Sequence, residues 1–254
     1  MAISIKDKSF RSERANDLIQ ISELLEGIGI PCFKIREASK QLTNFERTRK
    51  VSAEDVIDYS YWGYSIDSFE IPFVKIPRHI KPQNLNPVSA YISIDVIGST
   101  QSWGKMVDPF KKLEFNIELS GSSPQEENHH ICYHVDRHIV SESKEPHPMY
   151  HFHFGGNKMR FDEINIGNTI FLDCPRIMFH PLEMLLGLDF VLSNFFPEYW
   201  NELQHQSTYM SLIQEYYTAL VKPFAHTLAS KWPGYDHKSI EWQPNLLFPQ
   251  LMVL

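Results

Sequence analysis

The arrangement of apolar and polar residues is most regular in the middle of the chain, where apolar residues occupy every second position. Residues 89–96 and 112–119 both follow this pattern, with polar or charged side chains between the apolar ones. Successive residues of a β-strand point to opposite faces of a sheet. Each segment is therefore predicted to be a strand of an antiparallel sheet that has one buried face and one open face.

Residues 132–139 and 148–155 alternate in the same way, and their polar positions hold several histidines. In an antiparallel hairpin, directly opposed residues share a face. In such a hairpin the numbers of two opposed residues always add to the same value. The apolar faces of the two segments coincide only when this sum is odd, and a sum of 287 leaves a loop of about four residues between the strands. This register places Val135 opposite Phe152 on the buried face of the predicted hairpin.

The other face of this hairpin gathers the chemically active side chains. The stretch His129–Gly156 contains seven of the twelve histidines, and the register sets His134 against His153 and Asp136 against His151. A slip of the pairing by one residue would bury histidines beneath the aromatic face, so the apolar pattern selects this register. The candidate catalytic residues are therefore His134, Asp136, His151 and His153.

Other periodic segments flank this central region. Residues Ser12–Gly27 are predicted to form a helix, residues 32–35 a short strand, and residues 52–58 a short helix that follows a capping sequence. Residues Leu182–Phe196 are apolar nearly all round, which predicts a helix buried against the sheet. A further helix is predicted over Ser207–Val221.

These elements together predict an α+β fold. Its antiparallel sheet has about five strands, the fifth from residues 168–173, and is backed by C-terminal helices. A proline-rich connection separates an N-terminal helical or irregular segment, residues 1–80, from the sheet and helices of residues 81–254. A single domain over residues 1–254 is the alternative.

Composition limits the classes of partner and compartment. Asp and Glu total 31 against 24 Lys and Arg, so the net charge is −7 and the chain as a whole does not attract nucleic acid. Residues 33–50 are the best candidate for a local basic patch. The cysteines Cys32, Cys132 and Cys174 form neither a disulfide framework nor a paired zinc pattern. With neither a signal-peptide pattern nor a membrane-spanning apolar run, the chain is expected to be cytoplasmic.

Three interpretations of the histidine face remain open. His134, Asp136, His151 and His153 could bind a divalent metal such as zinc or manganese. They could instead carry out metal-free phosphodiester chemistry, in which one imidazole removes a proton and another protonates the leaving oxygen. In the third interpretation they are polar side chains that pack against loops or against a partner protein.

Five further residues could support a reaction at this face. His138 continues the row of histidines, and Arg137 or Arg160 would stabilise negative charge. Arg176 and His180 precede the predicted buried helix, and the N-terminal end of a helix can bind an anion.

The segment Tyr133–Gly155 resembles small histidine-rich bacterial toxin-like proteins of toxin–antitoxin and defence modules. The resemblance consists of an aromatic residue and an aspartate on one strand, a histidine-bearing loop and an HxH strand. His134, Asp136, His151 and His153 stand in the matching positions. The resemblance implies a prokaryotic toxin or phage-defence component that acts on RNA or nucleotides. The alternative is a non-catalytic structural or regulatory subunit of a multi-protein defence complex.

Overall fold

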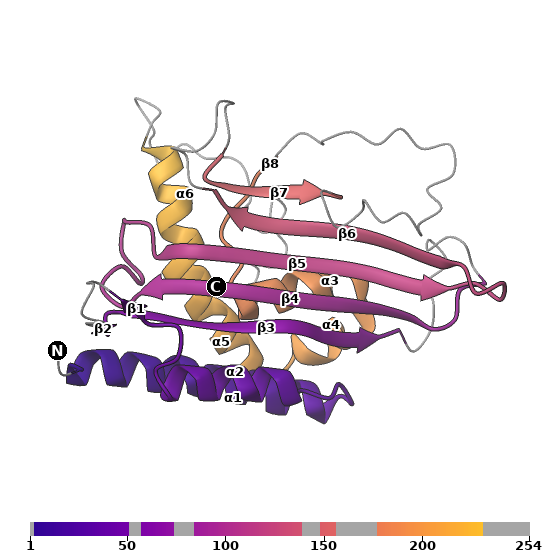
Figure 1. Cartoon of the computed structure of the whole chain (residues 1–254), viewed down its shortest axis with the longest axis horizontal. Helices are drawn as coiled ribbons and strands as arrows, with labels where there is room; N and C mark the ends of the chain where they lie inside the picture. The colour runs from indigo at the N-terminus through magenta and orange to yellow at the C-terminus, as the bar shows by residue number, and fades with distance from the viewer. Residues whose placement is uncertain (1–2, 51–56, 74–83, 139–147, 156–176, 231–254) are drawn as a thin grey trace.

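The computed structural model describes residues 3–50, 57–73, 84–138, 148–155 and 177–230. Within these residues, one antiparallel sheet of six strands has the order β3-β4-β5-β6-β7-β8 (Figure 1). The six strands are β3 Tyr61–Pro72, β4 Val88–Ser99, β5 Phe110–Ser122, β6 Asn128–Arg137, β7 Tyr150–Phe154 and β8 Ile177–Met178. Two short strands, β1 Arg49–Lys50 and β2 Ile57–Asp58, pair separately.

Helices lie behind the sheet and along one of its edges. In Figure 1, α1 and α2 lie along the β3 edge, and the C-terminal helices lie behind the strands. The helices are α1 Ile5–Gly27, α2 Phe33–Thr43, α3 Met184–Phe195, α4 Pro197–Leu203, α5 Ser207–Tyr216 and α6 Lys222–Ala229, with a π-helical turn Tyr217–Val221 between the last two. None of the helices among these described residues is long and apolar enough to cross a bilayer.

The predicted α+β class is therefore confirmed, with six strands where the sequence predicts about five. The additional strands are β3, which pairs with β4 although it precedes residue 81, and the two-residue β8, which pairs with β7. The predicted strand at residues 168–173 lies outside the described residues. The alternating segments 89–96 and 112–119 are confirmed as β4 and β5, and their apolar positions are buried except for Leu119, which is partly buried.

The core forms where the apolar face of the sheet meets α3 and α5. Ile94 on β4 lies opposite Phe115 on β5, and both side chains are buried. The α3 helix approaches β5 closely because Gly187 has no side chain, and a Cβ atom built there would lie 2.2 Å from the Phe115 ring. Of the four side chains of this helix that are predicted to be buried, Leu185, Leu188 and Leu192 are buried and Phe190 is only partly buried.

Two predicted elements near the N-terminus are wrong in type or length. Residues 32–35 form no strand, because Ile35, Ala38 and Leu42 make a buried helical stripe and place the segment at the start of α2. The α1 helix begins at Ile5, well before Ser12, because the Ser4 hydroxyl accepts a hydrogen bond from the Asp7 amide at 3.0 Å and caps it. Of the helix predicted for residues 52–58, only residues 57–58 are described, and they form β2.

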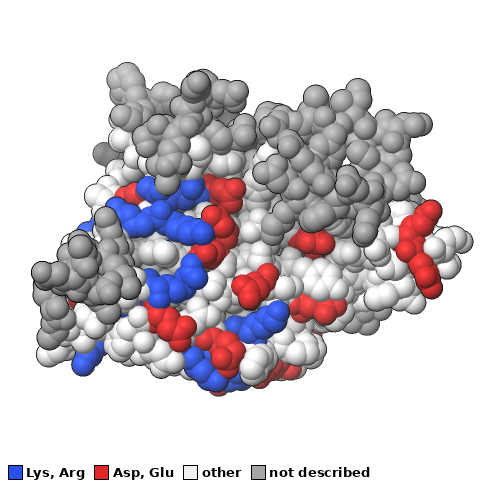
Figure 2. All heavy atoms as spheres, viewed as in Figure 1, with Lys and Arg blue, Asp and Glu red and all other residues white. Residues whose placement is uncertain are grey.

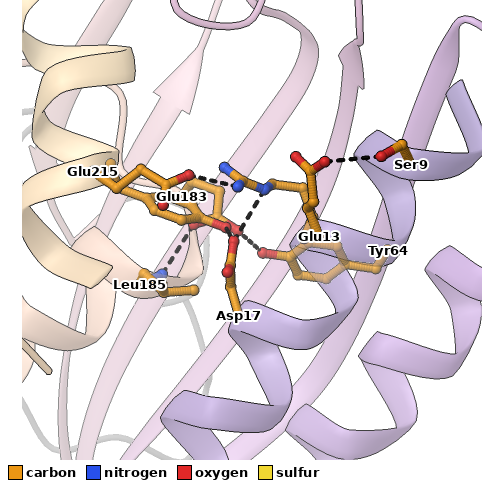
Figure 3. A network of polar contacts seen from close by, with 9 residues as sticks. Ser9, Glu13, Asp17, Tyr64, Glu183, Leu185 and Glu215 are labelled. Carbon is orange, nitrogen blue, oxygen red and sulfur yellow. Dashed lines mark hydrogen bonds and ion pairs between the residues drawn. The ribbon is translucent and has the colours of Figure 1, made fainter. Parts of the chain in front are cut away.

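A buried polar network joins α1 to the C-terminal helices (Figure 3). The Arg14 guanidinium lies 3.0 Å from a carboxylate oxygen of Asp17 and 2.5 Å from one of Glu215 on α5. The Tyr216 hydroxyl also donates to Asp17, at 3.0 Å. Since Arg14 is only 6% exposed, these partners offset the cost of burying its charge.

Glu183 extends the polar interior to the start of α3. Its carboxylate accepts hydrogen bonds from the Leu185 amide at 3.0 Å and from the Tyr64 hydroxyl (Figure 3). Burial nevertheless raises the pKa of Glu183 to about 7, because the loss of water outweighs these two donors. Burial likewise raises the pKa of Asp17 to about 6 in spite of the neighbouring Arg14. The network holds helices and sheet together and lies apart from the histidines.

Candidate functional site

The open face of the sheet, which points away from α3 and α5, carries the histidines. The predicted register of the histidine hairpin is confirmed: Val135 lies opposite Phe152. On the polar side, His134 lies opposite His153 and Asp136 opposite His151. Two separately predicted strands therefore place the four candidate catalytic residues on neighbouring positions of one face.

His134 lies at the centre of this group. Its Nε2 atom is 3.3 Å from Asp136 Oδ2 and 2.9 Å from His153 Nδ1. The His134 ring centroid is 6.2 Å from that of His151. One ligand-capable atom from each of His134, Asp136 and His151 lies within 4.8 Å of the others. The sequence pattern thus locates a compact cluster of nitrogen and oxygen donors.

The cluster is closed on the β7 side and more open on the β6 side. His151 and His153 are only 4% and 5% exposed, whereas the Asp136 side chain is 31% exposed. The expectation that the histidine face is the open one and the aromatic face the buried one is therefore wrong at β7, where Phe154 is 43% exposed.

The sheet edge explains the exposure of Phe154. Phe152 still reaches the core, with its ring centroid 5.9 Å from that of Phe190 on α3. Phe154 lies two residues further along β7, on the same face, and contacts the Tyr133 ring with ring centroids 5.4 Å apart. Burial at this edge depends on where the helical layer ends, and alternation along the strand does not report that.

Two of the supporting residues, Arg137 and His180, contact groups outside the cluster. Arg137 donates to Asp108 at 2.8 Å, away from the histidine row, and the His138 amide donates to the Met149 carbonyl at 2.7 Å. His180 stacks on Phe179 with ring centroids 4.5 Å apart, and burial lowers its pKa to about 4. Arg137 and His180 therefore belong to the surroundings of the hairpin rather than to the cluster, and a supporting role of the His138 side chain stays a prediction.

Arg160 and Arg176, the two remaining supporting residues, lie outside the residues that the structure describes. The anion site predicted from Arg176 and His180 accordingly stays a prediction for Arg176. The described half of that pair, His180, is partly buried against an aromatic ring, and its lowered pKa keeps it neutral at pH 7.

Strand β5 extends the polar face beside the cluster. Its Asn116 lies opposite His134 and its Glu118 opposite Cys132. Glu118 also borders an open depression of ≈ 400 Å³ on this face, and its other polar neighbours there include Asp67, Ser93 and Asn116. Figure 2 shows this side of the molecule, on which acidic and basic side chains are interspersed. The sequence pattern of β5 predicts this polar side, but not the depression.

The distance between His134 and Asp136 suits a metal ion. In a tetrahedral zinc site with bonds of about 2.0–2.1 Å, neighbouring donor atoms lie about 3.3 Å apart. The 3.3 Å between His134 Nε2 and Asp136 Oδ2 matches this separation. The same imidazole and carboxylate groups can also move protons, since each His–Asp or His–His contact lies within hydrogen-bonding distance.

Comparison with protein-family models, with curated proteins and with solved structures finds no match for this chain.

Proposed function

We propose that the chain is a hydrolase that binds a divalent cation through His134, Asp136 and His151 and cleaves a phosphodiester or nucleotide substrate. The observation that carries the proposal is the convergence of these three donors within 4.8 Å of one another. Two imidazoles and a carboxylate are a ligand set that zinc and manganese accept. With three protein ligands, a fourth position remains open for water.

In this proposal a bound metal ion would activate a water molecule, and His153 would donate a proton to the leaving oxygen. A catalytic zinc lowers the pKa of its bound water to about 7, which supplies hydroxide at neutral pH. His153 Nδ1 lies 2.9 Å from His134 Nε2, so its ring is next to the proposed metal position. From there it can donate a proton to the leaving oxygen.

A bound cation would also offset the repulsion between a negatively charged phosphate substrate and the acidic groups of the chain. The chain carries a net charge of −7, and the nearby depression is bordered by Asp67 and Glu118. A metal ion placed among neutral imidazoles adds positive charge where the substrate phosphate must bind. This supports a small nucleotide or a single phosphodiester group at the site, because such a substrate does not need a long basic surface.

The biological setting that we propose is a prokaryotic toxin or phage-defence component of the cytoplasm. It is supported by the resemblance of Tyr133–Gly155 to toxin-like proteins, in which His134, Asp136, His151 and His153 occupy the matching positions.

A non-catalytic subunit of a defence complex is the second candidate. It is favoured by exposed apolar side chains at the β7–β8 edge, where Phe154, Ile177 and Met178 are 43%, 61% and 53% exposed. Apolar side chains gathered at a sheet edge are common at protein–protein contacts. In that case the histidine cluster would have no catalytic role.

Metal analysis of the purified protein, combined with assays on RNA, DNA and nucleotides, tests the hydrolase proposal. We expect bound zinc or manganese, and hydrolysis that stops on chelation and returns when the metal is restored. His129→Ala is the matched control, because His129 is on the same strand but at an odd position, outside the row of His134. Activity that survives chelation would show that the reaction proceeds by acid–base catalysis without a metal ion. The absence of activity on every substrate would favour the non-catalytic subunit.

A further inference from the structure

A second group of metal-ligating side chains follows the first along the same face of β6. His130, Cys132, His134 and Asp136 occupy alternate positions of this strand and therefore share a face. Glu118 on β5 lies directly opposite Cys132 and diagonally from His130. The pairing of β5 with β6 thus brings a carboxylate, an imidazole and a thiol together.

His130 lies between the other two residues of this group, with one ring nitrogen toward each of them. His130 Nδ1 is 3.4 Å from Glu118 Oε1, and Cys132 Sγ is 4.0 Å from His130 Nε2. One donor atom from each of the three residues lies within 4.8 Å of the others. Zinc bonds of about 2.0–2.3 Å place tetrahedral donors about 3.3–3.6 Å apart. Because only one nitrogen of His130 can bind a given ion, the donors need to close by up to about 1.5 Å.

Burial also suits a thiolate-containing site. Cys132 is 1% exposed, and the His130 side chain is 10% exposed, whereas the Glu118 side chain is 37% exposed. The thiol and imidazole are therefore held inside, and the carboxylate can move to complete the set. Glu118 also borders the depression on this face, which gives a cation a route from solvent.

We propose that Glu118, His130 and Cys132 form a second transition-metal site, one that prefers zinc. A cysteine thiolate selects soft and borderline metals, and manganese favours oxygen and nitrogen donors. Zinc therefore occupies both sites, whereas manganese occupies the His134 site alone. This second site does not depend on the hydrolase activity proposed above.

The spacing of the two sites makes them separate mononuclear centres. Positions two residues apart on a strand are separated by about 6.6 Å. Two-metal hydrolases hold their ions about 3.5–4 Å apart so that one oxygen can bridge them. The cation at Glu118 therefore acts at the border of the depression, where it offsets the charge of Asp67 and Glu118 and can hold a phosphate oxygen.

Cobalt titration of the metal-free full chain tests this proposal, because a cobalt–thiolate bond absorbs in the near ultraviolet and a cobalt–imidazole bond does not. We expect the wild type to bind two cobalt or zinc ions per chain and to show the thiolate band. Cys132→Ser is expected to lose the band and one ion. Cys32→Ser is the matched control, because Cys32 is also buried but bonds to the Ile30 carbonyl at 3.2 Å.

A second variant guards against a folding defect in Cys132→Ser. Glu118→Gln changes a partly exposed side chain and is expected to weaken binding at this site by more than about 100-fold, beyond the usual effect of second-shell changes. A wild type without the thiolate band overturns the second site, whatever else it binds. A single ion that is lost in His134→Ala and kept in Cys132→Ser overturns the second site and leaves the first. The reverse result overturns the first site and leaves the second.

Discussion

At the scale of single residues, the contact between His134 and His153 places two ring nitrogens 2.9 Å apart. Two imidazolium ions cannot share such a contact, because both would donate and their charges would repel. At least one ring is therefore neutral, with a lone pair available for a proton or a metal. Asp136, 3.3 Å from the same nitrogen of His134, favours a positive group at this point.

The histidines are expected to respond differently to substitution because we assign them different roles. His134→Ala and His151→Ala should lose both the metal of this site and the activity. His153→Ala should keep the metal and lose about 10²–10⁴-fold in kcat/KM, the usual contribution of one acid–base group. Metal analysis and steady-state kinetics on the same preparations check this. Loss of the metal in His153→Ala would make His153 a ligand rather than a proton donor.

Glu183 is expected to make stability depend on pH. Its folded-state pKa of about 7 lies above its ordinary value of 4.5, so the folded chain holds a proton that the unfolded chain releases. This contribution is complete below pH 4.5 and is lost as the pH rises to about 7. Glu183→Gln keeps an acceptor for Leu185 and Tyr64 without the charge.

The measurement is urea unfolding of wild type and Glu183→Gln at pH 5, 6.5 and 8. Between pH 5 and pH 8, the variant should gain about 2–3 kcal/mol in free energy of unfolding relative to wild type. Other titrating groups are common to both chains and cancel in this difference. Parallel stability curves would mean that Glu183 is ionised throughout or that water reaches it.

At the scale of the elements, α3 and β5 depend on the missing side chain of Gly187. Alanine ordinarily stabilises a helix interior relative to glycine by about 1 kcal/mol. Here its Cβ atom would lie 2.2 Å from the Phe115 ring, and that ring is fully buried. The ring has no free space to move into, so the overpacking exceeds the gain in helix propensity.

Gly187→Ala is therefore expected to lower the free energy of unfolding by about 1–3 kcal/mol. Phe115→Leu in the same chain should recover part of this loss, and a double-mutant cycle measures the coupling. Gly27→Ala at the end of α1 is the control, because a Cβ atom there meets nothing within 4 Å. A neutral Gly187→Ala would show that the helix stands further from the sheet.

The elements also show which features the sequence could predict. The hairpin register followed from alternation on two segments at once, because only pairings with an odd sum put both apolar sets on one face. The strand predicted at residues 32–35 rested on a segment of only four residues. The helical stripe through Ile35, Ala38 and Leu42 extends over most of α2. Short apolar runs do not distinguish strand from helix, and longer periodicity does.

At the scale of the whole molecule, one face of the sheet forms the core and the other carries the candidate sites. The C-terminal helices cover one face, and the donors of both candidate metal sites lie on the other, in adjacent rows of β5, β6 and β7. Alternation predicted these rows. It could not predict that Phe154 is exposed, because that depends on how far the helices extend toward the sheet edge, and it did not predict the burial of His151 and His153 on the opposite face.

The position of β7 next to the short edge strand β8 predicts that metal binding stabilises this part of the sheet. β7 has five paired residues on its β6 side, and its other neighbour, β8, contributes two. Strands near an edge with few hydrogen bonds open locally at lower free energy than central strands. Asp136 on β6 and His151 on β7 are proposed ligands of one ion, so binding would tie β7 to the centre of the sheet.

Hydrogen exchange read by mass spectrometry tests this link, in a Cys132→Ser background that removes the second site. Without metal, amides of β4 and β5 should exchange most slowly and those of β7 faster. Zinc at about 100 times its dissociation constant should slow β7 exchange by about 100-fold, because it adds about 2.7 kcal/mol to the opening free energy. His151→Ala should abolish the slowing. Equal β7 exchange with and without bound zinc would place the ion away from β7 and contradict the proposed ligand set.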